Sequence, residues 1–102
     1  MIQRVVVIKL KDAYANDVDR AQVASHTRDV LSRIEGVRHL DIATPGDERC
    51  GHSWDLCILL RFDNIEAVEA YRIDKTHRAY ADVFLKPMLE VIRVWNFELI
   101  DG

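Results

Sequence analysis

Strand-like hydrophobic segments recur four times along this chain. Residues 2–10 contain the sequence VVVI, residues 54–62 read WDLCILLRF, and residues 91–100 read VIRVWNFELI. Residues 37–43 form a shorter segment in which hydrophobic and polar positions alternate. Because β-branched and aromatic side chains favour a pleated backbone, we expect a strand in each segment.

A helical spacing of hydrophobic positions follows the first predicted strand, in residues 17–35. Asn16 or Asp17 can cap the start of this helix, and Gly36 can end it in a left-handed turn. The stripe that identifies the helix comprises Val23, Thr27, Val30, Leu31 and Ile34.

A second helical region lies between the last two predicted strands. Asp63, with Glu66 three residues later, resembles a capping box and predicts a helix to about residue 72. We expect Asp74 to cap a new helix after a break, and Pro87 to end it. The stripe of this new helix comprises His77, Tyr80, Ala81, Phe84, Leu85 and Met88.

The predicted order is strand, helix, strand, strand, helix, strand, with a polar loop at residues 44–53. This order is typical of the ferredoxin-like α+β fold, in which right-handed crossovers place both helices on one face of an antiparallel four-stranded sheet. The chain has 102 residues and no internal repeat or linker, so we expect a single domain over residues 1–102.

Hydrophobic residues occupy both faces of the predicted sheet. In the third strand, Leu56, Ile58 and Leu60 share one face, while Cys57 and Leu59 share the other. Helices cover only one face, and the chain has no further element long enough to cover the second. We therefore expect two subunits to pack sheet to sheet as a homodimeric α/β barrel.

Charge and composition exclude several classes of partner. The net charge is −3, with both signs interspersed and no basic run, which argues against nucleic acid. No segment approaches the roughly 20 apolar residues of a membrane span, and the N-terminus lacks the pattern of a signal peptide. We expect a cytoplasmic protein in which Cys50 and Cys57 remain reduced thiols.

Several segments together resemble the stress-responsive A/B barrel (Dabb) family. They are the opening RVVVIKLKD, the first helix ending in IEGV, the segment FDNIEAVEAYRIDKTHRAYADVFLKPML and the last strand, so the resemblance covers nearly the whole chain. Its most specific part is Tyr71, then His77 six residues later, then a hydrophobic run into Lys86-Pro87. The resemblance implies a dimeric α/β barrel, and most members of this family have no assigned reaction.

The chain is also distantly similar to olivetolic acid cyclase, a plant member that closes a polyketide chain. That similarity implies catalytic roles for Tyr71 and His77, which match a tyrosine and a histidine near the substrate carbonyl. Two further pocket histidines of the plant enzyme match Arg4 and Leu56 here, which implies that these two residues line the pocket.

The residues themselves are compatible with a pocket between the second helical region and the sheet. In one continuous helix Tyr71 and His77 would lie about 240° apart, so they converge only if the helix bends at Asp74. A half-buried histidine is suited to proton transfer, and a tyrosine hydroxyl beside it can orient a carbonyl. The alternative is that His77 is a hydrogen-bonded core residue.

Arg4 is unusual on the first predicted strand because a buried arginine needs an acidic partner or an anionic ligand, such as a carboxylate. The alternative is an arginine that reaches solvent or pairs with an acidic residue. Phe84, on the second helical stripe, and Trp95, in the last strand, are further candidate lining residues, although aromatic residues in such places often belong to the core.

We expect neither a metal nor a cofactor. The loop Asp47–His52 contains metal-ligand residue types, but its spacing matches no zinc pattern, and a solvated loop is the better interpretation. Phosphate-binding glycine loops, nucleophile elbows and dinucleotide fingerprints are absent from the sequence.

Four functions remain open. We favour a small-molecule-binding barrel without committed chemistry, linked to stress by the family resemblance. The others are an enzyme that uses His77 and Tyr71 for acid-base chemistry on a carbonyl substrate, a purely structural oligomer, and a cofactor-free monooxygenase.

Overall fold

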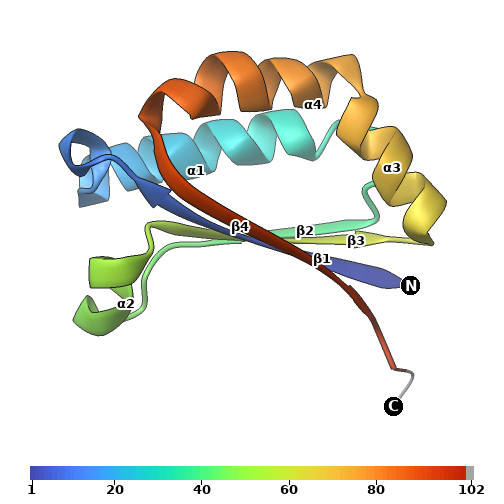
Figure 1. Cartoon of the computed structure of the whole chain (residues 1–102), viewed down its shortest axis with the longest axis horizontal. Helices are drawn as coiled ribbons and strands as arrows, with labels where there is room; N and C mark the ends of the chain where they lie inside the picture. Colours follow the sequence, from blue (N-terminus) through green and yellow to red (C-terminus); the bar gives the residue numbers. More distant parts are fainter. Residues whose placement is uncertain (101–102) are drawn as a thin grey trace.

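An antiparallel four-stranded sheet forms the centre of the molecule. The computed structural model describes residues 1–100. The strands are β1 (Ile2–Leu10), β2 (His39–Ala43), β3 (Leu56–Phe62) and β4 (Leu89–Glu98), in the order β2-β3-β1-β4. Helices α1 (Asp17–Leu31), α3 (Ile65–Ile73) and α4 (Lys75–Ala79) cover one face of this sheet (Figure 1). The predicted ferredoxin-like α+β fold is confirmed.

Asparagine side chains cap two of these helices. The Asn16 side chain accepts a hydrogen bond from the Asp19 backbone amide at 2.9 Å, which fixes the start of α1. The Asn64 side chain accepts one from the Ala67 amide at 2.9 Å, so Asn64, and not Asp63, caps α3. Asp63 instead forms an exposed ion pair with Arg38.

The end of α1 is shorter than its hydrophobic stripe predicts. The α-helix ends at Leu31, and residues 32–36 continue as turns, with Ile34 still buried in the core. Gly36 has φ = 93°, the left-handed conformation that a residue without a side chain adopts most easily. This turn leads the chain into β2.

Four short elements lie outside the predicted pattern. Residues 44–53 are not a plain loop, because they contain helix α2 (Glu48–Ser53), which Asp47 caps through a 2.7 Å bond from the Cys50 amide. This helix has six residues and no buried side chain, so no hydrophobic stripe reveals it. The others are the 3₁₀ turns η1 (Asp12–Tyr14) and η3 (Lys86–Met88) and the π-helical segment η2 (Tyr80–Leu85).

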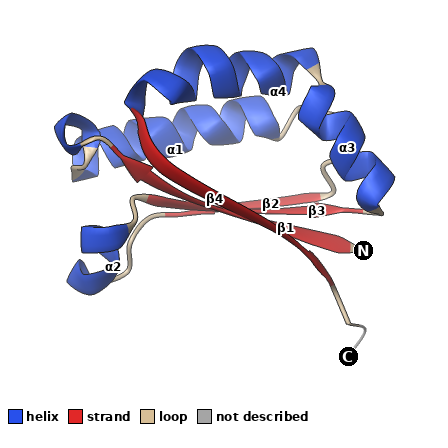
Figure 2. Cartoon of the chain, viewed as in Figure 1, coloured by secondary structure: helices blue, strands red, loops and turns tan. Residues whose placement is uncertain are grey.

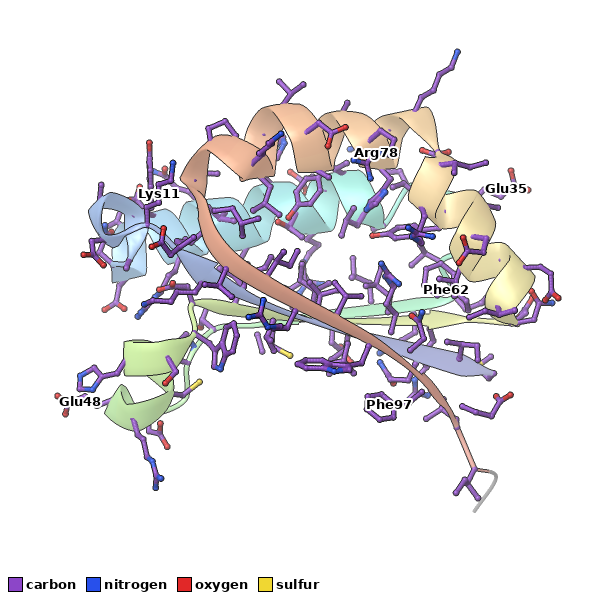
Figure 3. All side chains as sticks on the ribbon, viewed as in Figure 1. Lys11, Glu35, Glu48, Phe62, Arg78 and Phe97 are labelled. Atoms are coloured by element: carbon purple, nitrogen blue, oxygen red, sulfur yellow. The ribbon has the colours of Figure 1, made fainter. Side chains whose placement is uncertain are left out.

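The hydrophobic core lies between the helices and the sheet. Phe62 belongs to this layer, whereas Phe97 projects from the opposite side of the sheet (Figure 3). The strands supply every second residue to the core, as the alternating burial of β1 and β3 shows. These strand residues are Ile2, Val6, Ile8, Leu10, Leu56, Ile58, Leu60 and Phe62.

A buried ion pair fastens the start of α1 to the sheet. The Asp55 carboxylate is 1% exposed, and it accepts a 2.8 Å bond from the Arg20 guanidinium and a 2.6 Å bond from the Leu10 backbone amide. The guanidinium also donates to the Gly51 carbonyl at 3.1 Å. The Arg20–Asp55 pair therefore joins α1, α2, the end of β1 and the start of β3.

No element within residues 1–100 covers the other face of the sheet as a layer. Helix α2 lies on this side, but only at one end (Figure 2). Strand pairing places Leu59, Val5 and Trp95 in one row across three strands of the open face. Trp95 and Phe97 remain 46% and 55% exposed. Among the described residues, no helix is long and apolar enough to cross a membrane.

Candidate functional site

Tyr71 and His77 meet because the helix breaks between them. The chain leaves α3 at Ile73, and Asp74 has an extended backbone with ψ = 135°. The Asp74 carboxylate then accepts bonds from the Thr76 and His77 amides, at 2.8 and 3.1 Å, and starts α4. After this turn the rings of Tyr71 and His77 lie 4.2 Å apart between centroids. The predicted break and its cap are confirmed.

One nitrogen of His77 is held by the helix break itself. Nδ1 lies 3.2 Å from the Arg72 carbonyl oxygen, which can only accept a hydrogen bond. The proton of the neutral ring is therefore on Nδ1, and Nε2 keeps a free lone pair. Burial lowers the pKa of His77, and the positive charges of Arg78 and Arg4 act in the same direction, against the opposing effects of the Arg72 carbonyl and Asp74. The imidazole is thus neutral at pH 7 and can accept a proton.

Tyr71 is buried, with its ring packed between Phe62 and His77. The Phe62 ring meets it edge-on, at 5.1 Å between centroids. Burial raises the pKa of the Tyr71 hydroxyl well above its usual range, although the nearby charge of Arg4 opposes this shift. The hydroxyl therefore stays protonated at all physiological pH values and can donate a hydrogen bond.

Arg4 lies on the helix-facing side of β1 and is only 9% exposed. Its Nη1 donates to the Asn96 side-chain oxygen at 3.0 Å. Burial lowers the pKa of its guanidinium, but arginine remains charged at neutral pH. No carboxylate of residues 1–100 lies within ion-pair distance of it.

A cavity of about 230 Å³ lies where these three residues converge. Arg4, Tyr71 and His77 line it on its polar side. Much of the remaining wall is aliphatic, with Leu31 from α1, Ile58 and Leu60 from β3 and Leu85 from η2. Ile92 and Val94 of β4 border the cavity and are more than a third exposed. The arrangement can hold a small, largely apolar molecule and offer it one base, one hydroxyl donor and one cation.

The other three predicted site residues do not line this cavity. Trp95 pairs with Val5 and lies on the open face of the sheet, because Ile92 and Val94 take the helix-facing positions of β4. Phe84 packs against His26 of α1, at 4.1 Å between ring centroids. Leu56 is on the helix-facing side of β3 and pairs with Ile8, which lines the cavity, but Leu56 itself does not line it.

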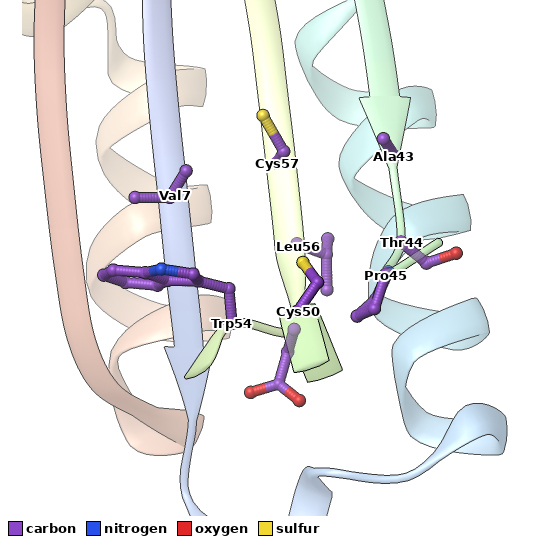
Figure 4. Close-up of a pocket in the computed structure, with 9 residues that line it drawn as sticks. Val7, Ala43, Thr44, Pro45, Cys50, Trp54, Leu56 and Cys57 are labelled. Carbon is purple, nitrogen blue, oxygen red and sulfur yellow. The ribbon is translucent and has the colours of Figure 1, made fainter. Parts of the chain in front are cut away.

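A second hollow, of about 240 Å³, lies on the open face beside α2 (Figure 4). Trp54 and the two cysteines, Cys50 and Cys57, line it together with Val7. Burial raises the pKa of the Cys57 thiol. Apart from Asp55, whose carboxylate oxygens are bonded to Arg20 and Leu10, no charged residue of the described part of the chain lines this hollow. It therefore offers little chemistry beyond an apolar surface.

Three polar residues of the first cavity were not among the predicted site residues. Arg72 and Arg78 line it, and each also forms an exposed ion pair, with Glu69 and Asp82 respectively. The sequence does not distinguish an arginine that lines a cavity from any other arginine on the surface of a helix. Tyr80 is on the predicted stripe, and its hydroxyl bonds to Thr27 of α1 at 2.6 Å. Burial raises the pKa of Tyr80 to about 12.

A protein-family model matches the sequence of this chain, and solved structures match its fold. The model of the stress responsive A/B barrel domain matches residues 2–99. None of the curated proteins matches the chain.

Several solved structures share the fold at low sequence identity. A Dabb family protein with a ferredoxin-like fold from Mesorhizobium loti has a TM-score of 0.82 and 19% identity, over 98% of this chain and 97% of that one. Hydroxynitrile lyase from Passiflora edulis has a TM-score of 0.79 and 12% identity, over 99% and 94%. A dimeric protein of unknown function from Bacteroides fragilis has a TM-score of 0.77 and 19% identity, over 96% and 95%.

Proposed function

Because the chain belongs to the stress-responsive A/B barrel family, we propose that it is a dimeric barrel protein that binds a small organic molecule between its helices and its sheet. The observation that carries this proposal is the cavity of about 230 Å³ at the helix break. Apolar walls with a few convergent polar groups are the usual construction of a small-molecule site. Arg4, Tyr71 and His77 are the central polar groups among its lining residues.

The open sheet face supports the dimer. Its centre is apolar, with the row Leu59, Val5 and Trp95, and polar residues such as Gln3 and Arg61 surround this centre. A hydrophobic centre with a polar rim is typical of a protein interface. The Bacteroides fragilis protein of the same fold is dimeric. A second copy of this chain packed on the open face would remove the exposed aromatic residues from water.

We place the protein in the cytoplasm, where a reducing environment keeps thiols free. Cys50 and Cys57 are both free cysteines, which agrees with that compartment.

Native mass spectrometry of protein purified from its own host tests the proposal. The expected result is a dimer that carries a small organic molecule, and denaturation should release that molecule. His77→Trp should fill the cavity and yield a dimer without it. A dimer of bare polypeptide mass, together with no binding of small aromatic probes in solution, would instead favour a purely structural oligomer.

A second candidate is a cofactor-free enzyme that uses His77 and Tyr71 on a carbonyl or hydroxyl substrate, as a polyketide cyclase would. The observation that favours it is the pairing of a neutral imidazole, whose Nε2 is free, with a protonated phenol 4.2 Å away between ring centroids. The imidazole would remove a proton and the phenol would donate a hydrogen bond to the developing oxyanion.

The similarity of fold to the Passiflora lyase suggests a hydroxynitrile as one substrate to try. Cleavage of mandelonitrile would be followed by the absorbance of the benzaldehyde released. An enzyme should lose this turnover on His77→Ala while still binding benzaldehyde. If the unsubstituted protein and His77→Ala give the same background rate, lyase chemistry at this site is excluded and binding remains.

A further inference from the structure

The charge of Arg4 is not balanced within the described chain. Arg4 is a buried residue, only 9% exposed, and the single hydrogen bond of its guanidinium within residues 1–100 goes to the neutral amide oxygen of Asn96. A guanidinium has five N–H donors, so most of its capacity is unused. The other well-buried arginine, Arg20, shows the usual solution, because it pairs with Asp55 at 2.8 Å.

The charged residues around Arg4 do not supply a counter-charge. Two more arginines, Arg72 and Arg78, line the same cavity, while no aspartate or glutamate among the described residues does so. Glu69 and Asp82 neutralise these two arginines on the helix surface, at 2.8 Å for Arg72 and 2.5 Å for Arg78. The charge of Arg4 therefore remains without a counter-charge inside the cavity. This is so although the chain as a whole has a net charge of −3.

The rest of the cavity fits an apolar body of limited size. Its walls are formed by aliphatic side chains such as Leu31, Leu60 and Leu85. Its volume of about 230 Å³ lies below the roughly 300–1,000 Å³ of pockets for drug-sized ligands. The cavity therefore suits a ligand with one charged end and an otherwise apolar body. A small organic acid has this form, whereas a nucleotide or a sugar does not.

On the basis of the proposed binding function, we propose that this cavity takes a small monocarboxylic acid, with its carboxylate on Arg4 and its apolar part against the wall formed by Leu31, Leu60 and Leu85. A planar guanidinium binds a carboxylate through two parallel N–H bonds. One uncompensated cation matches one negative charge, whereas a phosphate dianion would leave a second charge buried without a partner. The Tyr71 hydroxyl and the His77 Nε2 then face the ligand beside the carboxylate.

Calorimetric titration with matched acids and amides tests this assignment. The probes are benzoate against benzamide, hexanoate against hexanamide, and phenyl phosphate. Each amide keeps the shape of its acid but has no charge. We expect each carboxylate to bind roughly tenfold or more tightly than its amide, which is the usual effect of hydrogen bonds to a charged group.

Substitutions at Arg4 separate charge from geometry. Arg4→Met keeps the apolar stem and should reduce the preference for acid over amide to about one, while Arg4→Lys should keep part of it. Arg49→Met removes an arginine from α2, outside the cavity lining, and should leave the preference unchanged. Without ligand, Arg4→Met should melt at the same temperature as the unsubstituted protein or higher, because an unpaired buried charge is costly.

The outcomes separate this proposal from the binding function on which it rests. Amides that bind as tightly as acids would overturn the carboxylate assignment and leave the binding function intact. Tighter binding of phenyl phosphate than of either acid would also overturn it. If no probe of either class binds and the purified protein carries no ligand, both proposals fail.

Discussion

Among single residues, Asp55 has the clearest role in stabilising the fold. This carboxylate is almost fully buried, and it neutralises Arg20 while satisfying the Leu10 amide at the end of β1. Removing one partner of such a pair leaves the other charge buried without compensation, and that is more costly than the pair itself is stabilising. Asp55 is therefore a structural residue, although it borders a hollow.

Asp55→Asn is expected to lower the free energy of unfolding by about 3 kcal/mol, because Arg20 loses its buried counter-charge. Urea unfolding followed by circular dichroism measures this loss. Asp63→Asn is the matched control, since it removes the exposed pair with Arg38 and should change the unfolding midpoint very little. Equal effects of the two substitutions would show that burial does not decide the strength of these pairs.

The titration of His77 should appear in the pH dependence of stability. Burial lowers its pKa in the folded protein, while in the unfolded chain it has the ordinary value of about 6.5. The unfolded state therefore binds the proton more readily, and stability falls as the pH is lowered through about 6.5.

Unfolding free energies at pH 7.5 and 5.5 should differ less for His77→Gln than for the unsubstituted protein. His52→Gln, at an exposed position in α2, should keep the full difference. An unchanged pH dependence in His77→Gln would show that His77 is as well solvated in the fold as in the unfolded chain.

At the scale of elements, the break between α3 and α4 creates the site. Two helices that meet at Asp74 bring together two side chains that a continuous helix would separate. The Asp74 carboxylate holds this geometry by capping α4, and the cavity forms on the inner side of the bend. The geometry of the site therefore depends on a residue that does not line it.

Asp74→Ala should cost about 1 kcal/mol of stability through the lost cap, and it should also weaken the binding of benzoate or benzamide by displacing His77. Asn64→Ala removes the cap of α3 at a similar cost but does not touch the cavity, so it should bind the probes normally. The comparison is made by urea unfolding together with calorimetry. Normal binding by Asp74→Ala would show that packing alone positions His77.

The sequence patterns of the strands and helices also explain which site residues could be placed from the sequence. The strands, the main helices and the break at Asp74 follow from hydrophobic spacing and capping residues, so Arg4, Tyr71 and His77 could be placed in one region. Trp95 could not be placed, because its face depends on the pairing of β4 with β1, in which Val5 opposes Trp95. A shift of one residue in that register would reverse the faces.

Two other placements failed for equally local reasons. Phe84 lies in the π-helical segment η2, whose spacing differs from that of the α-helix assumed for its stripe, and it packs against His26. Leu56 lies on the correct face and pairs with Ile8, which lines the cavity, but Leu56 itself borders the hollow beside α2.

At the scale of the whole molecule, β4 is the element whose apolar side chains a single chain covers least. It is an edge strand, and its apolar residues are exposed on both faces, with Ile92 and Val94 on one and Trp95 and Phe97 on the other. Edge strands with this composition favour association. A second copy on the open face would cover the two aromatic residues.

Trp95→Lys should therefore shift the protein from dimer to monomer at micromolar concentration, because a charge would be buried in the interface. Sedimentation velocity measures the change. Val83→Lys is the control, since Val83 is 75% exposed on the π-helical segment and should leave the dimer intact. A monomer in the unsubstituted protein at all concentrations would reject sheet-to-sheet pairing.

The two thiols of the hollow beside α2 offer a chemical way to follow association. Cys50 is exposed on α2, while Cys57 points from β3 onto the open face and is half-buried there. Iodoacetamide should alkylate Cys50 at a rate that does not depend on protein concentration. The alkylation of Cys57 should slow as dilute protein is concentrated, and peptide mass spectrometry of the ratio of the two products would report the fraction of paired subunits.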